Sequence, residues 1–157
     1  MDDREFRNAM GKFVTGVTVI TTKTGDEVHG MTANAFMSVS LNPKLVLISI
    51  AEKAKMLPKI TESQRFVVNL LSESQKEISM QFAGQLKDSA DVDFVWEDGL
   101  PLIKDSIASI ICDVYSSQVA GDHTLFIGEV KQLTVKDGEP LTYFQGKYGR
   151  FFEEINV

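Results

Sequence analysis

The sequence has few of the residues from which disulfides and metal sites are built. Its one cysteine, Cys112, has no partner for an intramolecular disulfide. With only His29 and His123 besides, a zinc or iron site would consist mostly of carboxylates, so we expect no metal. Cys112 stands between Ile110 and Val114 on one face of an apolar run, which predicts a small buried side chain.

Long runs of one kind of residue are also missing. There is no basic run and the formal net charge is -6, so a nucleic-acid partner bound through its phosphates is not expected. No apolar run approaches the length of a bilayer-spanning helix, and the opening MDDREFRNAM is too acidic and polar for a signal peptide. These absences predict a cytoplasmic protein without a membrane partner.

Several motifs of nucleotide binding and hydrolysis are absent as well. Without GxGxxG, a nicotinamide cofactor would have to bind without the Rossmann fingerprint. The stretch GKFVTGVT has the glycine spacing of a P-loop, but it carries Val17 where the lysine is required. Neither GxSxG nor HExxH occurs. The sequence therefore offers no nucleophile elbow and no zinc-protease signature.

What the sequence does contain is the composition of an ordinary globular protein. Hydrophobic residues make up 43% and charged residues 24% of 157 residues, which suits one domain with a sizeable core. No repeat, low-complexity tract or linker divides the chain. We expect residues 1–157 to form a single domain.

Runs of β-branched and apolar residues predict that most of the chain is strand. Short turns such as TGDE and AGD separate them, which favours antiparallel hairpins. The run KLVLISIAE is continuously apolar, so we expect a central strand covered on both faces. The predicted strands cover residues 13–23, 27–31, 44–52, 64–71, 106–119 and 123–135.

Three segments predict helices. Asp2 or Asp3 caps a short N-terminal helix that carries Phe6 and Met10 on one face. In KAKMLPKITES, Pro58 either begins a second short helix or breaks a longer one.

In the third segment, SESQKEISMQFAG, Ser74 and Glu77 have the spacing of a capping box and Gly84 provides the stop. Because the helices do not alternate with the strands, a Rossmann domain is not expected. The pattern predicts a closed antiparallel barrel with helices at its edges.

Two short stretches are candidates for a site. Residues 31–40, MTANAFMSVS, place Thr32 and Asn34 between apolar runs, either as a surface loop or as backbone against which a ligand lies. His123, in AGDHT at the mouth of a predicted hairpin, is either structural or functional.

A cluster of lysines follows the apolar run at 44–52. Lys53, Lys55 and Lys59 form either a solvated helix face or a phosphate clamp. In the second case, free N–H groups at the start of a helix would act together with the lysine charges.

Five stretches, in this order, resemble a known family. They are TGVTVITT, GMTANAFMSVSLNPKLVLISI, ITESQRFVVNLLSESQ, GDHTLFIGEV and PLTYFQGKYGRF. They are similar to the flavin reductase domain with an FMN-binding split barrel, the small component of two-component flavin monooxygenases. The combination of T-A-N-A/S-F-x-S-V-S with G-D-H-x-x-x-x-G-x-V is specific. The resemblance implies a mainly β fold, an antiparallel Greek-key split β-barrel with flanking helices.

The resemblance also implies site residues. A loop at 32–35 runs under the isoalloxazine ring, 49–51 contact the ribityl chain and phosphate, and two lysines neutralise the phosphate. Relatives often carry Ser or Thr beside the basic residue, where this chain has Ala54 and Met56. The implied cofactor-binding residues are Thr32, Ala33, Asn34, Ala35, Ser49, Ile50, Ala51, Lys53, Lys55, Phe82, Ala83 and Tyr148, and His123 positions the nicotinamide.

The implied activity is that of an NAD(P)H:flavin oxidoreductase. A hydride passes from NADH or NADPH to N5 of FMN, or alternatively FAD, and the reduced flavin serves a separate flavin-dependent monooxygenase. The family implies a homodimer. The alternatives are a flavin-bound electron carrier that serves a protein partner, and a non-catalytic flavin-binding dimer module.

Overall fold

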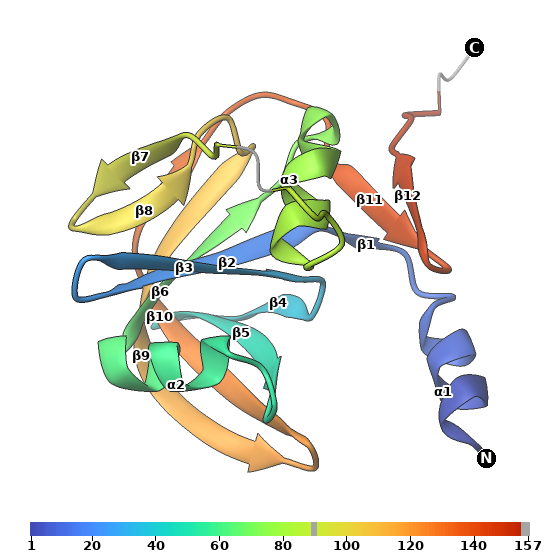
Figure 1. Cartoon of the computed structure of the whole chain (residues 1–157), viewed down its shortest axis with the longest axis horizontal. Helices are drawn as coiled ribbons and strands as arrows, with labels where there is room; N and C mark the ends of the chain where they lie inside the picture. The colour runs from blue at the N-terminus through green and yellow to red at the C-terminus, as the bar shows by residue number, and fades with distance from the viewer. Residues whose placement is uncertain (89–90, 155–157) are drawn as a thin grey trace.

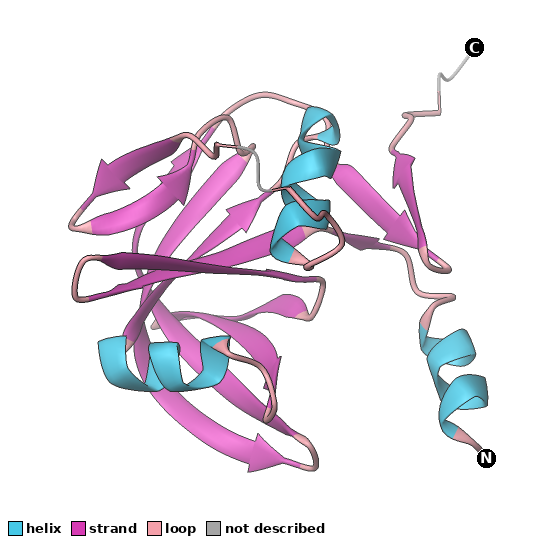
Figure 2. Cartoon of the chain, in the orientation of Figure 1, coloured by secondary structure: helices cyan, strands magenta, loops and turns pink. Residues whose placement is uncertain are grey.

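A seven-stranded antiparallel sheet forms the body of the protein (Figures 1 and 2). The computed structural model describes residues 1–88 and 91–154. The order of the strands in the sheet is β3-β2-β6-β9-β10-β5-β4. They are β2 (Thr18–Thr24), β3 (Glu27–Ala33), β4 (Phe36–Leu41), β5 (Lys44–Ala51), β6 (Arg65–Leu70), β9 (Ala108–Ala120) and β10 (His123–Val135).

The two edge strands of this sheet follow each other in the chain. Only Asn34 and Ala35 separate the end of β3 from the start of β4, so the curled sheet brings its edges together there. The sheet does not close between β3 and β4, which makes the barrel a split one. We call residues 34–35, at this opening, the seam. The predicted mainly β, antiparallel split barrel is confirmed.

Both predicted hairpins are present. Gly25, at φ +56°, turns β2 into β3, and Gly121, at φ +65°, turns β9 into β10; both angles favour glycine. The prediction for β5 is wrong in part, because β5 is next to the edge strand β4 and not central. Its Val46, Ile48 and Ile50 are buried inside the barrel, whereas the residues between them are half-buried on its outer face.

The barrel interior is a closely packed apolar core. Ile20, Ile48, Phe66 and Phe126 fill it. Helix α2 (Met56–Ser63) adds two buried side chains and covers the core. Pro58 lies in the first turn of this single helix, where its missing N–H costs no intrahelical hydrogen bond.

Cys112 belongs to the same core, as predicted. Burial, and then the charge of Asp113, raise the pKa of its thiol to about 12. The thiol is therefore neutral at physiological pH.

Helix α3 (Lys76–Phe82) follows the 3₁₀ turn η1 (Glu73–Gln75). The capping box consists of Ser72 and Gln75, so the predicted Ser74–Glu77 box is wrong. The 3₁₀ turn begins the helical path earlier than the spacing suggested, and the Gln75 side chain accepts from the Ser72 amide at 3.0 Å. Gly84, at φ +70°, follows the helix as predicted.

Two smaller sheets flank the barrel. β7 (Phe94–Glu97) and β8 (Leu100–Ile103) form a hairpin, and β1 (Thr15–Gly16), β11 (Leu141–Phe144) and β12 (Lys147–Arg150) form the other sheet. No helix in the described ranges is both long and apolar enough to cross a membrane.

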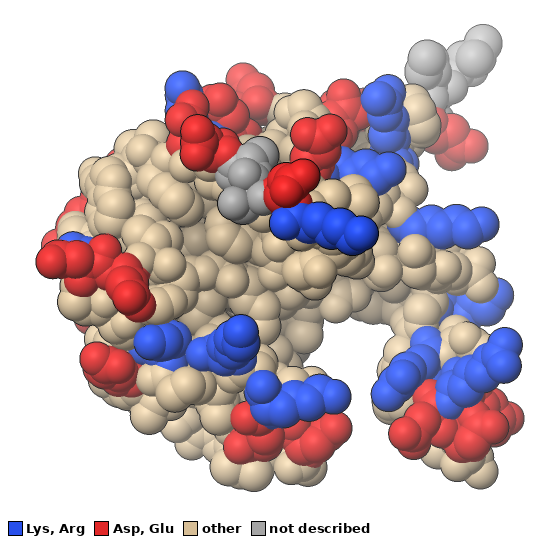
Figure 3. Space-filling view, in the orientation of Figure 1, with Lys and Arg blue, Asp and Glu red and all other residues tan. Residues whose placement is uncertain are grey.

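The N-terminal helix α1 (Asp3–Met10) begins at the predicted cap, where the Asp2 carboxylate accepts from the Glu5 amide at 2.7 Å. It stands apart from the barrel, and Figure 3 shows an open gap between the two. We call residues 1–14 the arm. The Gln145 amide, in the β11–β12 turn, donates to the Gly11 carbonyl at 3.0 Å and so connects the arm to the C-terminal hairpin.

Candidate functional site

The chain at the seam is exposed to solvent. Asn34 and Ala35 are both exposed, and the Ala35 carbonyl accepts from the Ser49 amide at 3.2 Å. Within the described ranges, neither the Asn34 nor the Ala35 N–H group donates to a backbone carbonyl. The seam therefore offers two N–H donors to a ligand, next to the end of β5.

Thr32 and Ala33, which were expected in the same loop, lie in strand β3 instead. β3 pairs with β2 up to the Thr18–Ala33 position, and the Thr18 hydroxyl donates to the Ala33 carbonyl at 2.7 Å. The strand pairing extends this far because Thr18 begins β2 directly opposite Ala33. Only Asn34 and Ala35 remain as the loop.

The predicted residues of β5 continue this edge toward His123. Ser49 lies beside Ala35, and Ala51 is opposite His123 in the pairing of β5 with β10. Ile50 is fully buried in the barrel core, so it exposes no surface to a ligand here. The structure therefore places residues 34–35, 49–51 and His123 in one continuous row.

His123 is held by its neighbour Asp122. The distance between the His123 Nδ1 and the Asp122 Oδ1 is 2.7 Å, and the Asp122 carbonyl accepts from the Glu52 amide at 2.9 Å. The hydrogen bond from His123, its charge when protonated, and the more distant Lys53 lower the pKa of the exposed Asp122 carboxyl. Lys53 thus belongs to the same end of the row.

The proposed phosphate clamp can be tested against the start of α2. The Leu57 amide already donates to the Ala54 carbonyl at 3.1 Å, and Pro58 has no N–H. The helix start therefore offers few free donors, and the charges of the exposed Lys53 and Lys55 are the main attraction for a phosphate there. Figure 3 shows basic side chains over α2, beside acidic ones at the tip of the β9–β10 hairpin.

A second group of predicted residues surrounds Ser79 on α3. The Ser79 carbonyl accepts from the Thr32 hydroxyl at 2.6 Å and from the Ala83 amide at 3.0 Å, and its hydroxyl lies 2.9 Å from the Tyr148 hydroxyl. Ser79 is fully buried, and nothing in the local sequence pattern marks it as a site residue.

The ring of Phe82 lies directly over Gly30 of β3. A Cβ at Gly30 would lie 2.3 Å from the ring, closer than real contacts allow. Gly30 is not among the predicted site residues, although a glycine inside a predicted strand is a known sign of close approach.

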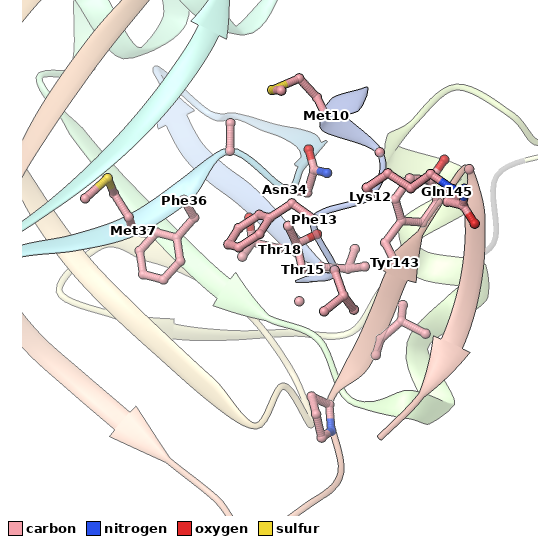
Figure 4. Close-up of a pocket in the computed structure, with 18 of the residues that line it drawn as sticks. Met10, Lys12, Phe13, Thr15, Thr18, Asn34, Phe36, Met37, Tyr143 and Gln145 are labelled. Carbon is pink, nitrogen blue, oxygen red and sulfur yellow. The ribbon is translucent and has the colours of Figure 1, made fainter. Parts of the chain in front are cut away.

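A large, mostly apolar cleft of about 1920 Å³ lies between the arm and the barrel. Asn34 and Ala35 line it, and Figure 4 shows Asn34 together with Phe13, Thr15 and Thr18. The predicted residues near His123, α2 and Ser79 do not line this cleft. It is larger than the roughly 300–1,000 Å³ of a typical small-molecule site.

These features fit a flavin better than a metal. Free N–H groups and small side chains at the seam suit the polar edge of a planar ring, and the lysines suit a phosphate. Within residues 1–88 and 91–154, no group of three or more His, Cys, Asp or Glu side chains could hold a metal ion.

Comparisons with known proteins agree with this chemistry. The model of the flavin reductase like domain matches residues 10–151. An NADH-dependent flavin reductase from Rhodococcus sp is 46% identical over 90% of this chain and 82% of its own length. The reductase component of 4-hydroxyphenylacetate 3-monooxygenase from Thermus thermophilus is 38% identical over 92% of this chain and 94% of its own.

A solved structure, that of the flavin reductase PheA2, has a TM-score of 0.96 and 61% identity, and covers 98% of this chain and 100% of its own. The chain belongs to the flavin reductase like domain family. The predicted family and enzyme class, an oxidoreductase that reduces flavin, are confirmed.

Proposed function

We propose that the protein transfers a hydride from NADH to N5 of FMN or FAD along the row that starts at the seam. The N–H groups of Asn34 and Ala35 carry this proposal, because within residues 1–88 and 91–154 neither donates to a backbone carbonyl, and both residues are exposed beside the strand end that leads to His123. NADH is preferred to NADPH in the proposal because the Rhodococcus relative is named as NADH-dependent.

Different residues of the row bind different parts of the flavin. Asn34 and Ala35 donate to the acceptor atoms on the polar edge of the ring, with Thr32 and Ala33 beside them. Ser49 and Ala51 line the ribityl chain, and the buried Ile50 between them supports the strand from the core side. Lys53 and Lys55 face the phosphate, where two exposed ammonium groups replace the donors that the start of α2 lacks.

Hydride transfer then depends on positioning. The flavin, when bound, supplies the redox chemistry. The protein has to hold nicotinamide C4 about 3–3.5 Å from the acceptor atom and exclude misaligned poses. His123 is placed to orient the nicotinamide at the far end of the row, and Asp122 fixes its ring through Nδ1. No protein nucleophile is needed.

The residues around Ser79 form the second part of the proposed site. Phe82 and Ala83, at the end of α3, border the tail of the flavin, and Tyr148 flanks the same region from β12. Their connection to β3 through Thr32 and Gly30 places them beside the strand that leads into the seam.

The proposed assembly is a homodimer. The arm exposes Phe6, Met10 and Phe13 by 50%, 57% and 78%, and these side chains border the open cleft. A second copy of the chain that packs into the cleft would bury this apolar lining. The Thermus relative is a reductase component of a monooxygenase, so we also propose that reduced flavin passes to a separate oxygenase.

Anaerobic mixing of the protein with excess FMN and then NADH or NADPH tests the proposed activity. The flavin absorbance should bleach over many turnovers, faster with NADH. A band that persists would refute the reductase proposal. A protein that binds FMN but reacts slowly with both nicotinamides would be an electron carrier, and one that does not bind FMN would be a non-catalytic module.

A further inference from the structure

Glu52 contacts both neighbours of His123 in the chain. The pairing of β5 with β10 ends at Ala51 and His123, and Glu52 is the first residue beyond it. The Glu52 amide donates to the Asp122 carbonyl at 2.9 Å, and its carboxylate accepts a hydrogen bond from the Thr124 hydroxyl. One residue therefore holds the chain on each side of His123.

The geometry of the strand explains why the Glu52 side chain reaches Thr124. Thr124 is paired with Ile50, and side chains two residues apart on a strand point to the same side. Glu52 and Thr124 are therefore diagonal neighbours across the pairing, whereas His123, paired with Ala51, points to the other side. The carboxylate thus holds the backbone of β10 without occupying the face that carries the imidazole.

Glu52 also lies between two parts of the proposed site. His123 is across the strand pairing from it, and Lys53 follows it directly in the chain. A hydrogen bond of 2.8 Å closes the turn at 51–54, which carries Lys53. Without the Glu52 side chain, the hairpin tip with Asp122 and His123 would be joined to this turn by one hydrogen bond fewer. The side chain therefore restricts how far the imidazole can move relative to the end of β5.

We infer that Glu52 is a positioning residue for hydride transfer, which acts by holding His123 in place for the nicotinamide. The inference rests on the proposed function, in which His123 orients the nicotinamide. It adds a residue that acts through the backbone of β10 and not by contact with NADH or FMN. The role requires the acceptor oxygen of the side chain and not its charge, because the partner is a neutral hydroxyl.

Steady-state kinetics with NADH at saturating FMN test this role. Glu52→Ala removes the acceptor, Thr124→Val removes the donor, and Glu52→Gln keeps an acceptor oxygen without the charge. We expect kcat/KM for NADH to fall about two- to tenfold in the first two variants, the effect of one ordinary hydrogen bond, and to stay within about twofold of wild type in Glu52→Gln.

FMN titration and a matched control separate this effect from a change of charge. The Kd of FMN should not rise in Glu52→Ala, because removing a carboxylate beside Lys53 does not weaken the attraction for a phosphate. Glu62→Ala removes an exposed carboxylate from α2 and should leave kcat/KM unchanged. Thermal unfolding of each variant is measured in parallel. A lower Tm with an unchanged kcat/KM would show that Glu52 is structural only and would overturn the inference.

The decisive comparison uses a His123→Ala background. If Glu52 acts through His123, adding Glu52→Ala there should cost little more, because two residues that serve one function are not additive. An equal fold loss in both backgrounds overturns the inference, and so does a Glu52→Gln variant as slow as Glu52→Ala. These Glu52 variants decide the question even if Thr124→Val fails to fold.

Failure of the inference can be distinguished from failure of the proposed function. Turnover of FMN by the wild type with NADH decides the proposed function by itself. A His123→Ala variant with the wild-type kcat/KM for NADH would overturn the inference and leave the reductase activity intact, whereas a wild type without turnover would overturn both.

Discussion

Replacing Gly30 by alanine should move α3 away from β3. The new Cβ would lie 2.3 Å from a Phe82 ring carbon, and an ordinary contact begins near 3.4 Å, so the ring must retreat by about 1.1 Å. Overpacking of this kind costs about 1–3 kcal/mol of unfolding free energy. For a protein of this size that lowers Tm by about 2–4 °C per kcal/mol.

Thermal unfolding followed by circular dichroism measures this loss, and FMN titration reports whether Thr32 moves with the helix. Gly16→Ala is the matched control, because a Cβ there meets nothing within 4 Å and Gly16 also lies in a strand. We expect Gly16→Ala to change Tm little and Gly30→Ala to lower both Tm and FMN affinity.

The explanation also predicts coupling between the two residues. In a Phe82→Leu background the ring is gone, so adding Gly30→Ala should cost much less than it does in the wild type. An equal cost in both backgrounds, or a Gly30→Ala variant as stable as Gly16→Ala, would refute the contact as the cause.

Three further predictions concern other parts of the molecule. Cys112 should resist thiol reagents in the folded state. The free energy of unfolding should also fall between about pH 9 and 12. In this range the unfolded thiol ionises, at its ordinary pKa near 9.0, while the folded thiol stays neutral up to a pKa of about 12. Urea unfolding across this range measures it, with Cys112→Ala as a control that lacks the contribution of the thiol. Phe13→Asp should convert the dimer to a monomer in sedimentation equilibrium, and a persistent dimer would count against the arm. Asp122→Ala should lower kcat/KM for NADH about two- to tenfold and leave the FMN Kd unchanged, and an unaltered kcat/KM would remove Asp122 from the site.

The parts of the fold that depend on neighbours in sequence were predictable. The hairpins at Gly25 and Gly121 follow from β-branched runs and tight turns, and the cap at Asp2 follows from its position before α1. The run at 44–52 was misread because a continuous apolar strand does not say what covers its second face. In this chain that face of β5 is half-buried and lies near the edge of the sheet.

The site was predictable only in so far as short motifs mark it. The seam and His123 lie in such motifs, and the fold does bring them into one row. Ser79 could not be found, because its partners Thr32 and Tyr148 are 47 and 69 residues away in sequence and serine is common on helix surfaces. The apolar side chains Phe6 and Met10 of α1 are exposed, and the sequence pattern alone does not say whether such a helix face packs against the same chain.

The seam has a consequence for how this site tolerates sequence change. Unpaired edge groups are ordinarily a hazard, since they can recruit a strand from another molecule. In the proposed site, the Asn34 and Ala35 N–H groups, which donate to no backbone carbonyl within the described residues, serve recognition instead, and they belong to the main chain. Asn34 and Ala35 can therefore be replaced by other residues with little loss of ligand contact, provided that the β3–β4 connection keeps its length. An inserted residue would displace both donors at once, so the seam should be far more sensitive to length than to composition.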